Sequence, residues 1–463
     1  MFRSIFNTFG NCAKIPELKS RILFTLGVLA VVRLIAWIRI PGLNGTVLSN
    51  YFASHSQNGG GMLGMYNTFA GGAMEHCAIG TLGIMPYISA TIIIQLLTAV
   101  WPKLSKLARE EGGRSKIIQY GRYLTVLLCL GQGLFFAIGW ENPQKLFPGL
   151  GQPLIFDLDH IWWYRIQTVL IMTTGTMLLM WLGEQITERG IGNGISLVIT
   201  VGILARLPQA ATGVHDMFFP AGGGENHANF GIFIVMVLLL VSVVAGVIAV
   251  TQAQRKIPVQ YAQRAVGRKM YQGGTSFMPL KVNYAGVMPI IFAQSILMFP
   301  QPILLGIGNY VSQPFLKNLF ISFAQTLNTG SVTYLIFYAL MILFFSYFWV
   351  ATQFNEIQIA DDLKKNGGYI PGVRPGQGTS DYLHKAMSRI TLAGAIFLTV
   401  IATIPIILSR QLNIPYQVAQ FFGGTSVLIA VGVMLDTMRQ IESHLMMRHY
   451  DGFLKKGRLR GRF

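Results

Sequence analysis

Residues 83–88 read Gly-Ile-Met-Pro-Tyr-Ile, and residues 286–291 read Gly-Val-Met-Pro-Ile-Ile. A second pair of segments matches in the same way, Gly-Ile-Ser-Leu-Val-Ile at 194–199 and Gly-Thr-Ser-Val-Leu-Ile at 424–429. All four segments lie in or at the start of long apolar runs, and their order is the same in each part of the chain. The sequence therefore predicts two structurally related halves.

The composition around these segments is typical of a membrane protein. Of the 463 residues, 52% are hydrophobic and only 12% are charged, whereas soluble domains contain about 25% charged residues. The mean hydropathy is +0.49. The three cysteines, Cys12, Cys77 and Cys129, are widely spaced and predict neither a disulfide framework nor a paired zinc motif. We therefore expect an integral membrane protein.

Ten apolar runs have about the 20-residue length that a helix needs to cross a bilayer. The first pair of matching segments lies in spans two and seven, and the second pair lies in spans five and ten. Because five is an odd number, two halves of five spans must cross the membrane in opposite directions, which predicts an inverted repeat. No small-residue cleavage site follows the first run, so we expect a true span there. The ten predicted spans are 22–38, 79–100, 118–139, 163–183, 190–206, 229–252, 283–305, 332–352, 388–408 and 423–441.

The predicted fold class is an all-α integral membrane protein with ten transmembrane helices in two inverted five-helix halves. Most of the 36 Lys and Arg residues lie in the two terminal segments and in alternate loops, which the positive-inside rule makes cytoplasmic. Both termini are then cytoplasmic. The predicted divisions are an N-terminal segment 1–21, a first half 22–206, an external hinge loop 207–228, a second half 229–441 and a basic tail 442–463.

One cytoplasmic loop, residues 253–282, contains six basic residues and no acidic residue. Topology alone requires positive loops, but a long segment of one sign is also suited to an anionic partner such as ribosomal RNA or an acidic protein. The six residues are Arg255, Lys256, Arg264, Arg268, Lys269 and Lys281.

Spans two and seven carry proline and polar residues at corresponding depths. Pro86 and Pro289 are expected to kink their helices, because proline removes a backbone hydrogen bond, and neighbouring groups or a water-lined cavity must then satisfy the freed carbonyl. The polar side chains either join packed helices or mark the working interface between the halves. They are Ser89, Gln95, Gln294 and Ser295.

Several kinds of chemistry lack their motifs in this sequence. There is no phosphate-binding loop for ATP hydrolysis and no His-Glu-x-x-His metal motif. An ion-coupled carrier usually keeps an ionisable residue deep in a span, but Arg33 and Arg122 lie toward span ends and Asp436 near a boundary. We expect no catalytic residue, metal or cofactor, and favour a passage with hydrophobic walls. A secondary transporter for a small solute is the alternative.

Over essentially its whole length the chain resembles the SecY family, the protein-conducting channel subunits of the Sec translocase. The resemblance implies a ten-helix clamshell around a central pore, hinged between spans five and six, with spans two and seven forming a lateral gate toward lipid. The motifs that carry it are IPGLN (40–44), FAGGA (69–73), LGIMPYISATIIIQLL (82–97), MWLGEQITERGIGNGIS (180–196), PLKVNYAGVMP (279–289), IPGVRPGQGT (370–379) and the stretch from FFGGTS to FLKKG (421–457).

The resemblance also implies roles for particular residues. Segment 62–76 resembles a plug helix on the external side and contains Phe69, Gly71, Gly72 and Ala73. The lateral gate would include Pro86, Ser89, Gln95, Pro289, Gln294 and Ser295. A ring of branched aliphatic side chains would close the pore, since it blocks ions by dewetting and offers a passing chain no hydrogen bonds. The ring would consist of Ile84, Ile88, Ile195, Ile199, Ile291 and Ile429.

The resemblance implies partners on the cytoplasmic side and within the membrane. Loops 253–282 and 353–389 would bind the ribosome or the SecA ATPase motor through their basic residues, including Arg374 in the turn 372–376. Small single-span subunits resembling SecE and SecG, signal sequences, nascent polypeptides and membrane lipids would be the other partners. The expected location is the bacterial cytoplasmic (inner) membrane.

Overall fold

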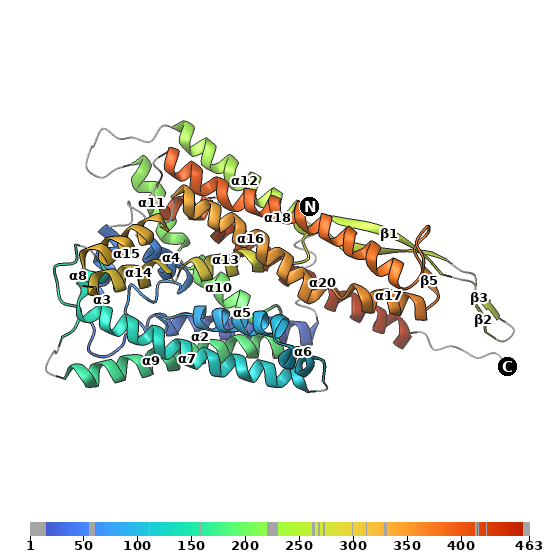
Figure 1. Cartoon of the computed structure of the whole chain (residues 1–463), viewed down its shortest axis with the longest axis horizontal. Coiled ribbons are helices and arrows are strands. Elements are labelled where there is room, and N and C mark those ends of the chain that lie inside the picture. Colours follow the sequence, from blue (N-terminus) through green and yellow to red (C-terminus); the bar gives the residue numbers. More distant parts are fainter. Residues whose placement is uncertain are drawn as a thin grey trace.

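The computed structural model is built mainly of helices (Figure 1). It describes residues 15–54, 61–110, 112–147, 149–156, 160–219, 230–261, 264–266, 269–271, 274–298, 300–311, 313–327, 331–412, 414, 416–422 and 424–456. The helices of the first half and of the hinge are α2 (Pro16–Ile35), α3 (Gly45–Ser54), α4 (Gly61–Phe69), α5 (Met85–Val100), α6 (Pro102–Arg109), α7 (Gly113–Glu141), α8 (Pro143–Leu146), α9 (Ile161–Arg189), α10 (Gly194–Leu204) and the hinge helix α11 (Leu207–Phe218).

The second half contains the remaining helices and all five strands. Its helices are α12 (Phe230–Gln252), α13 (Met288–Met298), α14 (Pro300–Tyr310), α15 (Pro314–Thr326), α16 (Val332–Gln353), α17 (Glu356–Lys365), α18 (Gln377–Gln411), α19 (Tyr416–Phe422) and α20 (Thr425–Lys456). Its strands are β1 (Gln254–Tyr261), β2 (Arg264–Val266), β3 (Lys269–Tyr271), β4 (Thr275–Lys281) and β5 (Gly368–Tyr369).

The two halves form two layers of helices in Figure 1. The lower layer contains α2, α7 and α9 of the first half, and the upper layer contains α12, α16 and α18 of the second half. The halves meet where α5 packs against α13 and where α10 packs against α20. These are the four helices that carry the repeated sequence segments.

Each of the ten predicted spans contains a helix. Among the described residues, eight helices are long and apolar enough to cross a membrane, or nine if α5 and α6, which are bent by 103°, are counted as one span. The helix α2 is outside that set, and it carries Glu17, Lys19, Arg21 and Arg33. Many leucines on the outer faces of these helices are exposed, which suits a surface in contact with lipid.

The repeat has a specific backbone form at α5 and α13. Gly83 and Gly286 have φ values of +58° and +61°, a left-handed conformation that glycine adopts without a steric penalty. A helix then begins two residues later, with Pro86 and Pro289 in its first turn. Proline is favourable there because the first-turn N–H groups have no intrahelical acceptor. The prediction that Pro86 and Pro289 kink their helices is therefore wrong, because each lies where its helix begins.

The segments predicted as loops contain regular structure. Segment 101–117 includes α6, and 207–228 includes α11. In 253–282, β1 and β4 form an antiparallel pair to which β5 adds, giving the order β4-β1-β5, while β2 and β3 form a two-stranded ribbon. The all-α expectation missed these small sheets, because the alternating burial of Ile257 and Val259 is short and lies among basic residues.

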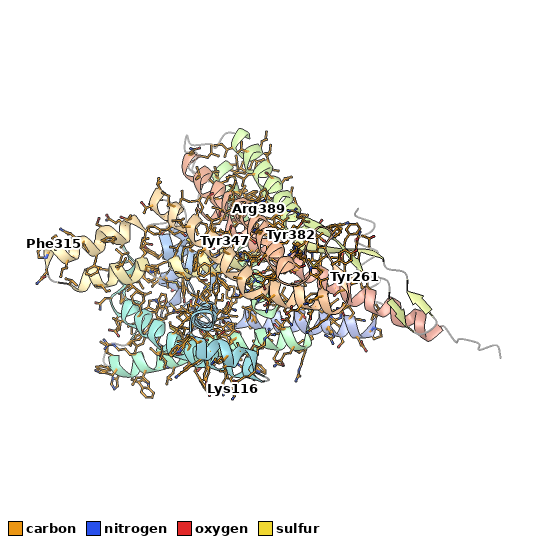
Figure 2. All side chains as sticks on the ribbon, turned by 45° about the vertical axis from the view of Figure 1, so that its right-hand side comes forward. Lys116, Tyr261, Phe315, Tyr347, Tyr382 and Arg389 are labelled. Carbon is orange, nitrogen blue, oxygen red and sulfur yellow. The ribbon has the colours of Figure 1, made fainter. Side chains whose placement is uncertain are left out.

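Two clusters of buried side chains stabilise the fold. The larger cluster contains residues from both halves, including Trp140, Tyr334 and Tyr338. The smaller cluster lies under the β4-β1-β5 sheet. Tyr261 on β1 and Phe315 on α15 lie toward opposite ends of the molecule (Figure 2), so the sheets and the α14–α15 pair mark its two ends.

Candidate functional site

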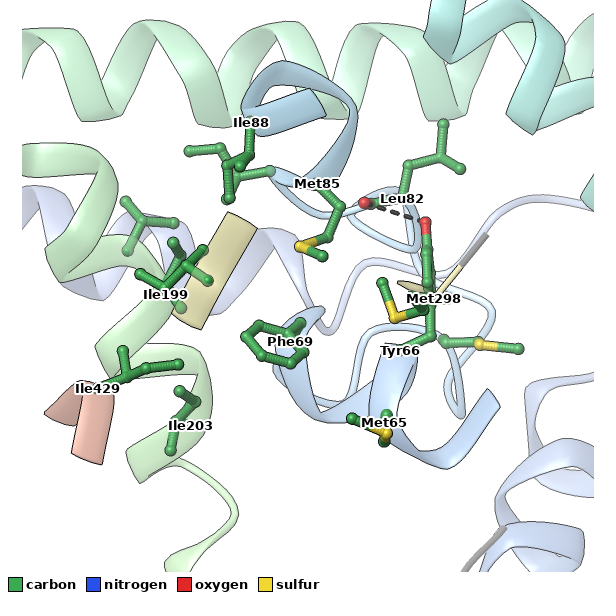
Figure 3. Close-up of a cluster of buried hydrophobic side chains, with 14 of the residues drawn as sticks. Met65, Tyr66, Phe69, Leu82, Met85, Ile88, Ile199, Ile203, Met298 and Ile429 are labelled. Carbon is green, nitrogen blue, oxygen red and sulfur yellow. Dashed lines mark hydrogen bonds between the residues drawn. The ribbon is translucent and has the colours of Figure 1, made fainter. Parts of the chain in front are cut away.

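The predicted isoleucine ring comes from four helices. Ile84, Ile88, Ile199, Ile291 and Ile429 all belong to the larger buried cluster and are at most 5% exposed. Figure 3 shows Ile88, Ile199 and Ile429 entering this cluster from α5, α10 and α20. The sixth residue, Ile195, is partly buried at the edge of the cluster. The structure thus gathers five of the six isoleucines at the contact between the halves.

The predicted plug segment lies directly beside these isoleucines. Its helix α4 ends at Phe69, which is 5% exposed and lies next to Ile199 and Met85 in Figure 3. The Tyr66 hydroxyl donates a hydrogen bond of 3.1 Å to the Leu82 carbonyl oxygen. Ala73 is completely buried. The cluster is therefore filled by the plug segment as well as by the ring.

The glycines of the plug segment allow close backbone contact. Gly71 and Gly72 have φ values of +66° and +86°, so both favour glycine. A Cβ atom on Gly71 would lie 2.9 Å from the Gly202 Cα atom of α10, closer than carbon atoms can pack. The structure therefore gives these glycines a role in packing the segment against α10.

The predicted lateral gate is the contact between α5 and α13. Pro86, Pro289, Gln294 and Ser295 are buried, and the Ser295 hydroxyl donates a 2.6 Å hydrogen bond to the Ile291 carbonyl oxygen. Three buried polar atoms on these helices have no hydrogen-bond partner among the described residues: Ser89 Oγ, Gln95 Oε1 and Gln294 Oε1. Each such atom costs about 1–3 kcal/mol. The two helices of the predicted gate thus carry buried polar atoms that this fold leaves unpaired among the described residues.

The sequence analysis missed a buried charged group next to the plug segment. Glu75 forms an ion pair with Arg206, and both side chains are about nine-tenths buried. Burial lowers the pKa of His76, although the neighbouring Glu75 carboxylate opposes that shift. The His76 ring stacks on Trp37, with ring centroids 4.7 Å apart. In the sequence, the indication of this buried charge was the presence of an acidic residue in the largely apolar stretch 69–84.

The predicted binding loops come together in one unit. The β1 strand of loop 253–282 pairs with β5 of loop 353–389, matching Gln260 with Tyr369. Their shared core contains Ile257, Leu280, Phe354, Ile370 and Leu383. The strands extend beyond the helices in Figure 1. This unit therefore presents both loops at one end of the molecule.

The basic residues of this unit occupy different positions. Arg255 and Lys256 are exposed on β1, Arg264 and Lys269 lie on β2 and β3, and Arg268 lies outside the described residues. Arg374 is exposed in a turn whose flanking residues Gly372 and Gly376 have φ values of +80° and +94°. The Thr379 hydroxyl donates a 3.0 Å hydrogen bond to the Arg374 carbonyl oxygen, which fixes the backbone at this arginine.

Two halves of membrane-spanning helices that meet along a buried apolar cluster are the architecture of a membrane channel. The SecY family profile matches residues 78–438. The protein translocase subunit SecY of Chlamydia trachomatis is 44% identical over 457 residues, which cover 97% of this chain and 98% of that protein. The protein of the same name from Escherichia coli K12 is 42% identical over 446 residues, 96% of each chain. The chain belongs to the SecY family, so it is a channel subunit of a protein translocase and not an enzyme.

Solved channel structures have the same fold. A structure described as a protein-conducting channel superimposes with a TM-score of 0.57 at 18% identity, covering 91% of each chain. Sec61 in the canine ribosome–channel complex from the endoplasmic reticulum superimposes with a TM-score of 0.55 at 17% identity, again over 91% of each chain. The predicted fold class, ten transmembrane helices in an inverted-repeat clamshell, is confirmed.

Proposed function

We propose that the isoleucine ring is the constriction through which unfolded polypeptides pass. The observation that carries this proposal is the burial of isoleucines from α5, α10, α13 and α20 in one cluster between the halves. Branched aliphatic side chains give a passing chain no hydrogen bonds, and a narrow apolar ring excludes water and ions when closed. Its members are Ile84, Ile88, Ile195, Ile199, Ile291 and Ile429.

Hydrophobic segments leave this pore sideways into lipid between α5 and α13. The buried polar atoms of Ser89, Gln95 and Gln294, which have no partner among the described residues, support this role, since helices that carry unsatisfied polar groups gain by parting to expose them. Pro86, Pro289 and Ser295 belong to the same interface. A signal sequence would part the two helices and occupy the space between them.

The segment 62–76 closes the resting pore from the external side. Phe69 supports this role because it packs beside the isoleucines. Gly71, Gly72 and Ala73 form the tight turn after the plug helix. One structure with this fold bears a title stating that the plug domain of the SecY protein stabilises the closed state and maintains a membrane seal; it has a TM-score of 0.58 and 18% identity.

The unit formed by loops 253–282 and 353–389 binds the partner that supplies the driving force. The ribosome and a SecA-type ATPase motor are the expected partners, and exposed Arg255, Lys256 and Arg374 support contact with an anionic surface. Small single-span subunits like SecE and SecG complete the complex. The basic loops support a cytoplasmic position for this unit and both termini, with the chain in the cytoplasmic membrane of a bacterium.

Reconstitution of the complex in vesicles tests this function. We expect uptake of an unfolded preprotein in the presence of the motor and ATP, with no uptake of a folded, cross-linked version of the same preprotein. Uptake of a small solute driven by an ion gradient, without preprotein transport, would instead support a secondary transporter.

A further inference from the structure

Glu75 is a carboxylate buried at the junction between the plug segment and the rest of the first half. Its side chain is 9% exposed, and it follows the tight turn of Gly71 and Gly72. A buried carboxylate is retained only where charged or polar partners replace its water. The partners of Glu75 therefore indicate what it does.

The carboxylate connects three separate elements. Arg206, at the junction of α10 and α11, donates from Nη2 to Oε2 of Glu75, and Gln209 in the first turn of α11 donates to Oε1 at 3.2 Å. On the other side, Asn67 of α4 donates from Nδ2 to Oε2 at 2.9 Å. The Asn67 Oδ1 atom also accepts the Glu75 backbone N–H at 3.2 Å. The plug helix is thus joined to α10 and α11 through one carboxylate.

A second contact attaches the same turn to α2. The Arg33 guanidinium donates from Nη1 to the Gly71 carbonyl oxygen at 2.9 Å. Arg33 and Arg206 belong to the first half of the molecule, and Gln209 belongs to the hinge helix α11, which also packs against α19 of the second half. These contacts therefore hold the turn to the first half and the hinge, while the isoleucine ring beside Phe69 is made by both halves.

We propose that Glu75 is a positioning residue that holds the plug in the closed channel through its ion pair with Arg206. The inference rests on the proposed role of segment 62–76. When the channel opens, the plug helix can leave Glu75 behind, which breaks the contact with Asn67. Alternatively, it carries Glu75 with it, which breaks the ion pair with Arg206. Weakening the pair shifts the channel toward the open state without changing any residue that contacts the passing chain.

The test begins with Glu75→Gln, which keeps the shape of the side chain and removes its charge. The assembled complex is placed in planar bilayers, and resting ion conductance is measured without preprotein. Loss of one partner of a buried ion pair strongly destabilises the state that contains the pair, which here is the closed channel. We therefore expect the resting conductance to rise about tenfold or more. Export of a preprotein with a weakened signal sequence should also increase. The matched control is Glu141→Gln, which breaks a buried pair with Arg165 (2.6 Å) between α7 and α9 and should leave conductance unchanged.

Two further variants separate positioning from a general loss of stability. Exchanging the charges, Glu75→Arg with Arg206→Glu, should restore the silent channel, whereas Arg206→Glu alone should leak. In a chain lacking residues 62–76, the variant Arg206→Gln should add no conductance beyond that of the deletion. A silent Glu75→Gln channel, or a leak that persists after the charge exchange, overturns the proposal. If the deletion itself does not leak, the plug role fails instead. If the Glu75→Gln chain does not assemble but the charge-exchanged chain does, this result would support the ion pair between Glu75 and Arg206.

Discussion

The backbone N–H of Gly192 donates a 2.8 Å hydrogen bond to Oε1 of Gln440. The bond joins the turn between α9 and α10, in the first half, to α20 in the second half. Gly192 has φ +91°, and a Cβ atom there would lie 2.9 Å from Leu197 and 3.1 Å from Thr437. The adjacent Arg439 donates to the Thr251 carbonyl oxygen at 2.6 Å. The middle of α20 thus links the turn between α9 and α10 to the last turn of α12.

Gln440→Ala should destabilise this link. The buried Gly192 N–H would lose its acceptor, at a cost of about 1–3 kcal/mol. We expect a lower midpoint of thermal unfolding in detergent than for wild type. Glu442→Ala is the matched control on an exposed position of the same helix, and it should leave the midpoint unchanged. Equal midpoints for both variants would mean that this bond does not stabilise the contact between the halves.

Ile88→Ser combined with Ile291→Ser should make the resting channel conduct small ions. Each change removes roughly 1.5–3 kcal/mol of apolar transfer preference, enough in a pair to raise the hydrated population more than tenfold. Planar-bilayer conductance measures the effect. The control pair is Ile336→Ser with Leu340→Ser, on the exposed face of α16. An unchanged baseline would contradict the ring, unless deletion of 62–76 in the same background reveals a leak that the plug had covered.

Cysteines at Ser89 and Ser295, or at neighbouring positions of α5 and α13, should cross-link in the closed channel. The two helices are in contact, and a covalent bond between them should prevent a signal sequence from entering lipid. Preprotein transport is measured before and after reduction, which should restore it and serves as the internal control. Failure of every pair tried along the two helices would contradict the lateral gate.

Arg374→Glu should leave membrane insertion intact and strongly reduce motor-driven transport. The turn holds this arginine in an exposed, fixed position, so reversing its charge turns an attractive contact with an anionic partner into a repulsive one. Transport into vesicles and salt-sensitive motor binding are the measurements. Lys317→Glu, on an exposed position of α15 outside this unit, makes the same charge change as a control. Normal transport by the Arg374→Glu channel would exclude the proposed contact.

The sequence by itself determined the spans and the repeat. Hydrophobic length is a local property, and a membrane requires every backbone polar group within it to be satisfied, which leaves helices as the simple solution. The repeated Gly-x-Met-Pro motif was also visible without a structure. Its effect on the backbone was not, because proline acts differently in the first turn and in the middle of a helix, and only the structure shows that Pro86 and Pro289 lie in the first turn.

The tertiary structure decided which distant side chains meet. The third strand of the sheet, β5, joins β1 through the pairing of Gln260 with Tyr369, far along the chain. Ile195 lies at the edge of the ring cluster and Ile199 lies within it, although both belong to the same repeated segment of the sequence. Glu75 and Arg206 are 131 positions apart, so no local pattern relates them. Their contact exists because the plug turn packs on α10, where burial forces opposite charges to pair.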